Sequence, residues 1–191
     1  MPSGELPPLS TVGVGPAVEL IGSDRQGRAG SAEDIERAWS VLADVMDPEV
    51  PVINVVDLGI VRDVRWSAGH LQVIVTPTYS GCPATEFIET LIEEALTTAG
   101  FHQPVLKQQL DPAWTTDWIT ATGRENLRAY GVAPPVGSAN KLSLLAAAPE
   151  IACPQCGSVH TERVSEFGST ACKALYRCLD CLEPFDYFKC I

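Results

Sequence analysis

Two C-x-x-C motifs near the C-terminus constrain the fold of this chain more than any other feature. The motifs are Cys153–Cys156 and Cys178–Cys181, and 21 residues separate them. A C-x-x-C turn places two thiolates within reach of one ion, and a hairpin between two such turns brings four thiolates together. The spacing predicts a closed site with structural Zn²⁺, whose ligands are Cys153, Cys156, Cys178 and Cys181. Four thiolates also bind iron–sulfur clusters, so that alternative stays open.

The residues between the two motifs favour a hairpin. β-branched and aromatic residues occur at 158–165 and 175–177, and Gly168-Ser-Thr can turn the chain between them. A module as short as residues 151–191 buries little apolar area, so bound zinc would supply much of its folding free energy, on the order of 10 kcal/mol. Structural disulfides are the alternative, and a chain without a signal peptide makes them the less favoured one.

Two further cysteines of this region are not part of a C-x-x-C motif. Cys172 lies between the motifs, and Cys190 is the penultimate residue. Free cysteine is among the most buried residue types, so Cys172 is expected to be a small buried hydrophobe, whereas burial is less expected so close to the terminus. As alternatives, Cys172 and Cys190 could be additional thiol ligands for a second metal or a transient cluster, or they could form a disulfide.

The charge balance argues against nucleic acid as a partner. The chain has 24 acidic and 13 basic residues and a formal net charge of −11, and residues 151–191 contribute five acidic and four basic side chains. Nucleic-acid binding draws its affinity from Lys and Arg that neutralise phosphates, and no basic stripe is present. Protein partners are the better expectation.

No apolar run is long enough to cross a membrane, and the N-terminus lacks the pattern of a signal peptide. The sequence therefore predicts a soluble cytoplasmic protein that does not bind a membrane. The cytoplasm keeps thiols reduced, which again favours a metal over disulfides.

Composition and hydrophobic periodicity divide the chain into four parts. A stretch rich in Gly and Pro without periodicity predicts a disordered tail, and a run of Pro, Gly and small residues predicts a linker. The predicted parts are a tail at 1–30, an α+β domain at 31–135, a linker at 136–150 and the four-cysteine zinc-binding module at 151–191.

The predicted α+β domain has a small three-stranded sheet with helices on one face, followed by a small zinc-ribbon-like module. Ser31 should cap a first helix that ends before Pro48, and Phe87 should lie on the buried stripe of a second helix. The remaining expected elements are a hairpin at 60–66 and 70–76, the second helix at 84–99, a third strand at 105–110 and a third helix at 114–130.

Cys82 is the remaining chemical candidate, because it lies just before the predicted second helix. Backbone N–H groups and the helix dipole at a helix N-terminus stabilise an anion such as a thiolate. Asp47, Glu49 and Asp57 come from an earlier loop and could gather at the same end of the sheet. The alternative is that Cys82 is a packed core residue and the three acids cap loops, which the residues alone favour.

Several of these motifs resemble a known family. Asp47-Pro-Glu-Val-Pro51, the segment 54–61 and Thr76-Pro-Thr with Cys82-Pro83 resemble the MIP18 (DUF59) family of iron–sulfur assembly factors, over residues 32–135. The segments 168–178 and 183–190 are similar to the tail of one subgroup of that family, the PaaD proteins of phenylacetate degradation. The combination of both halves makes the resemblance specific.

The resemblance implies an accessory factor with no turnover of its own. Such a factor matures or maintains the metal centres of the multicomponent phenylacetyl-CoA epoxidase, which carries out ring 1,2-epoxidation. Its implied partners are the oxygenase component with a di-iron site, the reductase component with an iron–sulfur cluster, and the iron–sulfur assembly machinery. Cys82 matches the reactive cysteine of the family, and Asp47, Glu49 and Asp57 match the acidic positions near it. Together these residues would hold a transient iron ion or iron–sulfur cluster.

Two other functions fit parts of the sequence. A thiol oxidoreductase could use Cys153 and Cys156, although a redox C-x-x-C normally opens a helix in a thioredoxin-like βαβ unit. A zinc-ribbon protein could also bind nucleic acid or assist transcription, and its affinity would then fall steeply with salt.

Overall fold

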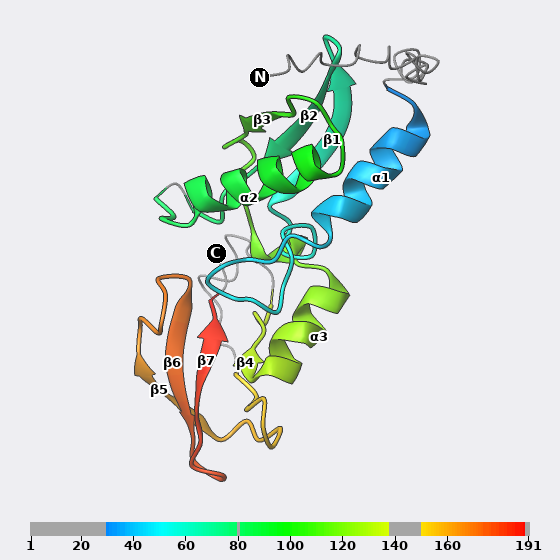
Figure 1. The fold of residues 1–191 in the computed structure, drawn as a ribbon. Helices are drawn as coiled ribbons and strands as arrows, with labels where there is room; N and C mark the ends of the chain where they lie inside the picture. Colours follow the sequence, from blue (N-terminus) through cyan, green and yellow to red (C-terminus); the bar gives the residue numbers. More distant parts are fainter. Residues whose placement is uncertain (1–29, 80, 138–149, 190–191) are drawn as a thin grey trace, which may run out of the picture.

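The first helix begins where the sequence predicts. The structure is a computed structural model that describes residues 30–79, 81–137 and 150–189 (Figure 1). In α1 (Ala32–Leu42), the Ser31 hydroxyl accepts a hydrogen bond from the Asp34 backbone N–H, and the Asp34 carboxylate accepts one from the Ser31 N–H. This reciprocal cap satisfies two N–H groups that would otherwise lack partners.

The predicted hairpin forms the first two strands of a small sheet. β1 (Val61–Ser67) and β2 (His70–Val75) are antiparallel, and β3 (Val105–Gln108) pairs with β2 in parallel. Ala68 and Gly69 connect the hairpin with φ angles of 51° and 83°. Two consecutive left-handed residues give a turn whose twist matches that of the strands, which explains the tight connection.

The second helix, α2 (Thr85–Thr98), covers the same face of this sheet as α1 (Figure 1). The predicted α+β class, with helices on one face of a three-stranded sheet, is confirmed. The expected buried stripe of α2 is wrong at its first residue, because Phe87 is 54% exposed. Successive residues of a helix are rotated by about 100° around its axis, so Phe87 and Ile88 lie on different faces. The face that packs against the sheet is formed by Ile88, Ile92 and Leu96.

The third predicted helix is interrupted. Instead of one helix over 114–130, a single 3₁₀ turn at Thr116–Trp118 precedes α3 (Ala121–Tyr130). The break occurs at Thr120, whose side chain accepts a hydrogen bond from the Gly123 N–H, 3.0 Å away, and so caps α3. Thr favours the cap over the helix interior because its hydroxyl competes for backbone groups.

A second sheet contains the C-terminal module. β5 (Thr161–Ser165) and β6 (Lys173–Cys178) are the hairpin that the sequence predicts, and β6 pairs next with β7 (Pro184–Phe188). A fourth strand, β4 (Val132–Ala133), follows α3 and pairs with β7 in parallel. The strand order β4-β7-β6-β5 therefore joins the C-terminal module to the end of the α+β part. We call residues 150–189 the ribbon.

The ribbon and the α+β part also share one hydrophobic core. Phe188 at the end of β7 is 1% exposed and packs against Trp114, with 6.3 Å between the ring centroids. Cys172 and Val132 belong to the same cluster of buried residues as the residues of the first sheet and its two helices. The two parts are thus packed on one another rather than merely tethered.

Some predictions concern residues that the structure does not describe. The predicted tail at 1–30, except for its last residue, most of the predicted linker at 136–150, and Cys190 lie outside the described residues. Within those residues, no helix combines the length and the apolar character that crossing a membrane requires.

Candidate metal centre and thiol cleft

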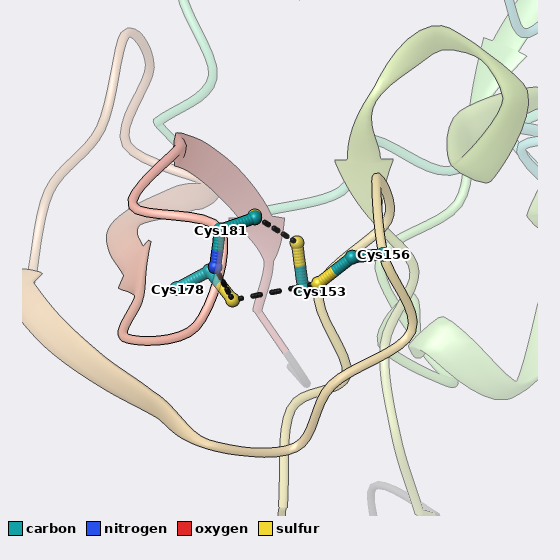
Figure 2. Close-up of side chains that lie close together, drawn as sticks. All are labelled: Cys153, Cys156, Cys178 and Cys181. Atoms are coloured by element: carbon teal, nitrogen blue, oxygen red, sulfur yellow. Dashed lines mark hydrogen bonds between the residues drawn. The ribbon is translucent and has the colours of Figure 1, made fainter.

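The four cysteines of the two C-x-x-C motifs converge on one point (Figure 2). Their Sγ atoms all lie within 4.8 Å of one another, with 3.7 Å between Cys153 and Cys181 and 3.6 Å between Cys156 and Cys178. A tetrahedral Zn²⁺ with Zn–S bonds of about 2.3 Å separates its sulfurs by about 3.8 Å. The four thiols therefore have the spacing of ligands around one tetrahedral ion, and the predicted convergence is confirmed.

Each motif closes through a short turn. The Gly157 N–H donates to the carbonyl of Cys153 over 2.9 Å, and the Cys181 N–H donates to the Cys178 Sγ over 3.5 Å. The residue after each motif has a left-handed backbone, with φ of 77° at Gly157 and 66° at Leu182. The two turns are thus alike in form, but only the first has the glycine that this conformation favours.

Leu182→Gly should raise the free energy of unfolding by about 0.5 to 1 kcal/mol. A left-handed conformation costs a residue with a Cβ about 1 to 2 kcal/mol, and glycine avoids this cost. The greater conformational freedom of glycine in the unfolded chain offsets part of the resulting gain in stability. The Leu182 side chain is 68% exposed, so its removal loses little burial. Urea unfolding of the metal-loaded protein measures the change. Gly157→Ala is the matched control and should destabilise, and a Leu182→Gly protein less stable than the parent would contradict the argument.

Hydrogen bonds prepare the four thiols for a cation. Backbone N–H groups, that of Cys181 foremost, lower the pKa of Cys178 to about 6. A hydrogen bond from the Glu183 N–H also lowers the pKa of Cys181. Burial and the neighbouring thiols outweigh it and raise that pKa to about 12. Cys178 is therefore ready to bind a cation as a thiolate, whereas Cys181 keeps its proton until a cation replaces it. Four protein ligands leave no coordination position for a substrate, which is the property of a structural site.

A separate cleft lies where the ribbon meets the α+β part. The space in it that water can enter is about 20 Å³, room for about one water molecule, and most of its lining is apolar. The side chains in it that carry chemistry are those of two cysteines and three acids: Cys82, Cys172, Asp47, Glu49 and Glu89. Cys82, Asp47 and Glu49 are the predicted transfer residues, Cys172 is one of the two cysteines outside the motifs, and Glu89 comes from α2.

Cys82 lies in the turn that leads into α2. Its N–H donates to the carbonyl of Tyr79 over 3.1 Å, and its own carbonyl accepts from Thr85 over 3.2 Å. The N-cap of α2 is Ala84, which offers no side-chain hydrogen bond to the first turn. The half-buried Cys82 thiol therefore lies beside a helix N-terminus without a side-chain cap, where the helix dipole favours an anion.

The three predicted acids have different positions. Asp47 is buried, and its Oδ1 accepts hydrogen bonds from the N–H groups of Glu49 and Val50, each 2.8 Å long. Burial raises the pKa of this carboxyl, although the two hydrogen bonds act in the opposite direction. Glu49 is half-buried in the cleft lining. Asp57 is not part of that lining, because its carboxylate accepts from Asn54 and from Thr120, the cap of α3. The cleft thus brings together Cys82, Asp47 and Glu49 but not Asp57.

Cys172 is 7% exposed and comes from the turn before β6. Its Sγ lies 3.0 Å from the Thr170 hydroxyl, and burial raises the pKa of its thiol. The buried small residue that the sequence predicts is confirmed, but no sequence signal indicates the cleft that it lines. The pairing of β7 with β4 and the packing of Phe188 on Trp114 bring this turn to the α+β part.

Two family descriptions cover most of the described chain. Residues 35–100 match a family of "Iron-sulfur cluster assembly protein", and residues 137–189 match the "PaaD zinc beta ribbon domain". The first range lies within the α+β part, and the second contains the whole ribbon.

Two curated relatives match the chain. The Escherichia coli K12 protein named as the D component of a "Putative 1,2-phenylacetyl-CoA epoxidase" is 54% identical over 157 residues, which are 82% of this chain and 93% of that protein. A "Fe-S protein maturation auxiliary factor" of Porphyromonas gingivalis is 36% identical over 90 residues, 46% of this chain and 82% of the relative. Among solved structures, a DUF59 domain from Bacillus anthracis matches 49% of this chain and 90% of its own, with 23% identity and a TM-score of 0.46.

Proposed function

Since this chain belongs to the PaaD family of iron–sulfur assembly proteins, we propose that it is a non-catalytic maturation factor for the metal centres of phenylacetyl-CoA epoxidase. The observation that carries the proposal is the match to the Escherichia coli epoxidase component over 93% of that relative's length, in both the assembly part and the ribbon. The chain delivers or repairs iron or an iron–sulfur cluster and turns over no substrate itself. Aerobic phenylacetate catabolism is the process that it serves.

Cys82 is the transient ligand of the cargo in this proposal. Its half-buried thiol opens into a cleft beside the N-terminus of α2, where a thiolate is stabilised without being enclosed. Glu49 supplies an oxygen ligand or accepts the thiol proton from the same cleft. Asp47 holds the loop that carries Glu49 through its two backbone hydrogen bonds, and Asp57 holds the loop before α3.

The ribbon has a structural role in the proposal. Cys153, Cys156, Cys178 and Cys181 would hold Zn²⁺, which contributes folding free energy to a module with little core of its own. A zinc-stabilised ribbon keeps β7 in place and therefore completes the wall of the cleft. Reduced thiolate ligands fit a cytoplasmic location.

The proposed clients are the oxygenase and reductase components of the epoxidase, and the proposed donor is the iron–sulfur assembly machinery. The net charge of −11 favours protein partners over nucleic acid. The four cysteines of the C-x-x-C motifs form one group, and neither motif opens a helix, which argues against a thiol oxidoreductase.

Cys82→Ser should leave the fold intact but lower the iron and cluster content of the epoxidase components. Serine keeps the size of the side chain but is a poor ligand for iron–sulfur clusters. The measurement is iron and sulfide per client chain after coexpression with the variant, compared with the parent. Thr90→Ala, an exposed change on α2, the helix that follows Cys82, is the matched control and should leave client occupancy unchanged. Full occupancy with Cys82→Ser would overturn the proposed role.

A further inference from the structure

Two short contacts between sulfurs show what the candidate metal site requires of the ribbon. One joins Cys153 to Cys181 over 3.7 Å and the other joins Cys156 to Cys178 over 3.6 Å, so each contact runs from one C-x-x-C motif to the other (Figure 2). Sulfur ligands of a tetrahedral zinc ion lie about 3.8 Å apart. The ligand set is therefore complete only while the two motifs are held at a fixed separation and orientation.

Asp180 lies inside the second motif, between Cys178 and Cys181, and is not one of the four candidate ligands. Its Oδ2 accepts a hydrogen bond from the Ser158 hydroxyl, and its Oδ1 lies 3.2 Å from Nδ1 of His160. Ser158 and His160 belong to the segment that follows the first motif. Both oxygens of this one carboxylate therefore reach from the second motif to the chain that leaves the first.

Backbone hydrogen bonds connect the same segments. The Leu179 N–H donates to the His160 carbonyl over 2.8 Å, and the His160 N–H donates to the Ser158 hydroxyl oxygen over 3.0 Å. The Ser158 carbonyl accepts from the N–H of Cys153, the first ligand, over 2.8 Å. Ser158 thus links Asp180 of the second motif to the backbone of the first.

Charge does not explain an acid at position 180. Four thiolates outnumber the two charges of Zn²⁺, so the loaded site is anionic and repels a nearby carboxylate. The Asp180 side chain is 58% exposed, and an ion pair with His160 at such exposure contributes little. A carboxylate does offer two acceptor oxygens held in one plane, which fixes the direction of both bonds. The contribution of Asp180 is therefore geometric.

We propose that Asp180 is a positioning residue of the metal site, and that its contacts with Ser158 and His160 hold the two motifs at the separation that the ion requires. Groups that orient metal ligands from outside typically change metal affinity by about 10- to 100-fold when they are removed. An exposed group belongs at the lower end of that range, because water can replace its hydrogen bonds. The inference rests on the proposed zinc site, but it does not depend on Cys82 or on cluster transfer.

The test is the zinc affinity of the full chain, measured by competition with a chelator. The proteins compared are the parent, Asp180→Ala, Ser158→Ala and the double variant. Each single variant should bind zinc about tenfold more weakly than the parent. The double variant should lose less than the sum of the two single losses, because both changes remove the same hydrogen bond.

Two further variants separate geometry from charge. Asp180→Asn keeps an acceptor oxygen for Ser158 and gains an amide that can donate to a neutral His160, but it removes the negative charge. It should bind zinc as the parent does. Glu183→Ala removes an acid just after the same motif, whose carboxylate has no hydrogen-bond partner among the described residues, and it should also bind as the parent does.

Co²⁺ in place of zinc adds a spectroscopic readout, because its visible absorption reports the geometry of the ligands. The spectrum should be altered in Asp180→Ala and parent-like in Asp180→Asn. A readout of this kind separates the position of the ligands from the overall stability of the ribbon.

The outcomes separate this inference from the proposed function. Parent-like affinity and spectrum in Asp180→Ala would overturn the inference, and equal shifts in Asp180→Asn and Asp180→Ala would do so by assigning the effect to charge. Equal loss in Glu183→Ala would overturn it as well. A parent chain that binds neither Zn²⁺ nor Co²⁺ would overturn the zinc site itself and the role of Asp180 with it. Client occupancy with Cys82→Ser tests the transfer role independently.

Discussion

Cys178→Ser should abolish zinc binding and unfold the ribbon. Zinc in a structural site of this kind contributes on the order of 10 kcal/mol to folding, and three remaining thiolates do not close a tetrahedral site. Cys178 is the ligand most available as a thiolate, because backbone N–H groups lower its pKa to about 6. The measurements are zinc per chain by elemental analysis, and protection of the ribbon against limited proteolysis.

Cys82→Ser is the matched control, because Cys82 lies outside the four-sulfur group. It should retain about one zinc per chain and the proteolytic pattern of the parent. Undiminished zinc in Cys178→Ser would show that the convergence of the four thiols is not a metal site. Iron and sulfide in place of zinc in the parent, lost with Cys178, would make the ribbon itself a cluster site.

Phe188→Ala should destabilise the protein by about 3 to 5 kcal/mol, the usual cost of deleting a fully buried aromatic side chain. Phe188 is 1% exposed and packs against Trp114 in the core that the two parts share. Its loss therefore leaves a cavity between the ribbon and the α+β part. Urea unfolding, followed by tryptophan fluorescence, measures the loss.

Phe167→Ala is the matched control on the same ribbon. Phe167 is 64% exposed and contacts the Lys189 ammonium, which lies 4.5 Å from its ring centroid. An exposed cation–π contact is worth about 0.5 to 1 kcal/mol, so this variant should lose far less stability. Equal losses in the two variants would show that the ribbon is not packed on the α+β core.

Features that depend on neighbouring residues were predictable from the sequence. The first helix begins at Ser31 because the cap and its partner Asp34 are three residues apart. The C-x-x-C motifs could be recognised as one metal site because the spacing within each motif brings two thiols together, whatever surrounds them.

Errors arose where a choice between local alternatives depends on distant packing. Phe87 and Ile88 are both apolar, and only the sheet beneath α2 decides that Ile88 faces inward. The segment at 114–130 has helical periodicity, but Trp114 turns toward the core and donates to the Leu58 carbonyl over 3.1 Å. Such contacts join residues far apart in sequence, so no local pattern predicts them.

The sequence by itself determined the chemistry available to this protein: four thiols paired by two short motifs, a cysteine before a helix, and acidic residues in one loop. The tertiary structure alone decided which of these groups meet. β4 pairs with β7, and Phe188 packs on Trp114, so Cys172 shares a cleft with Cys82, whereas Asp57 is bound elsewhere by Asn54 and Thr120. The physical reason is that burial of apolar area between distant segments, rather than local propensity, fixes how the two parts face one another.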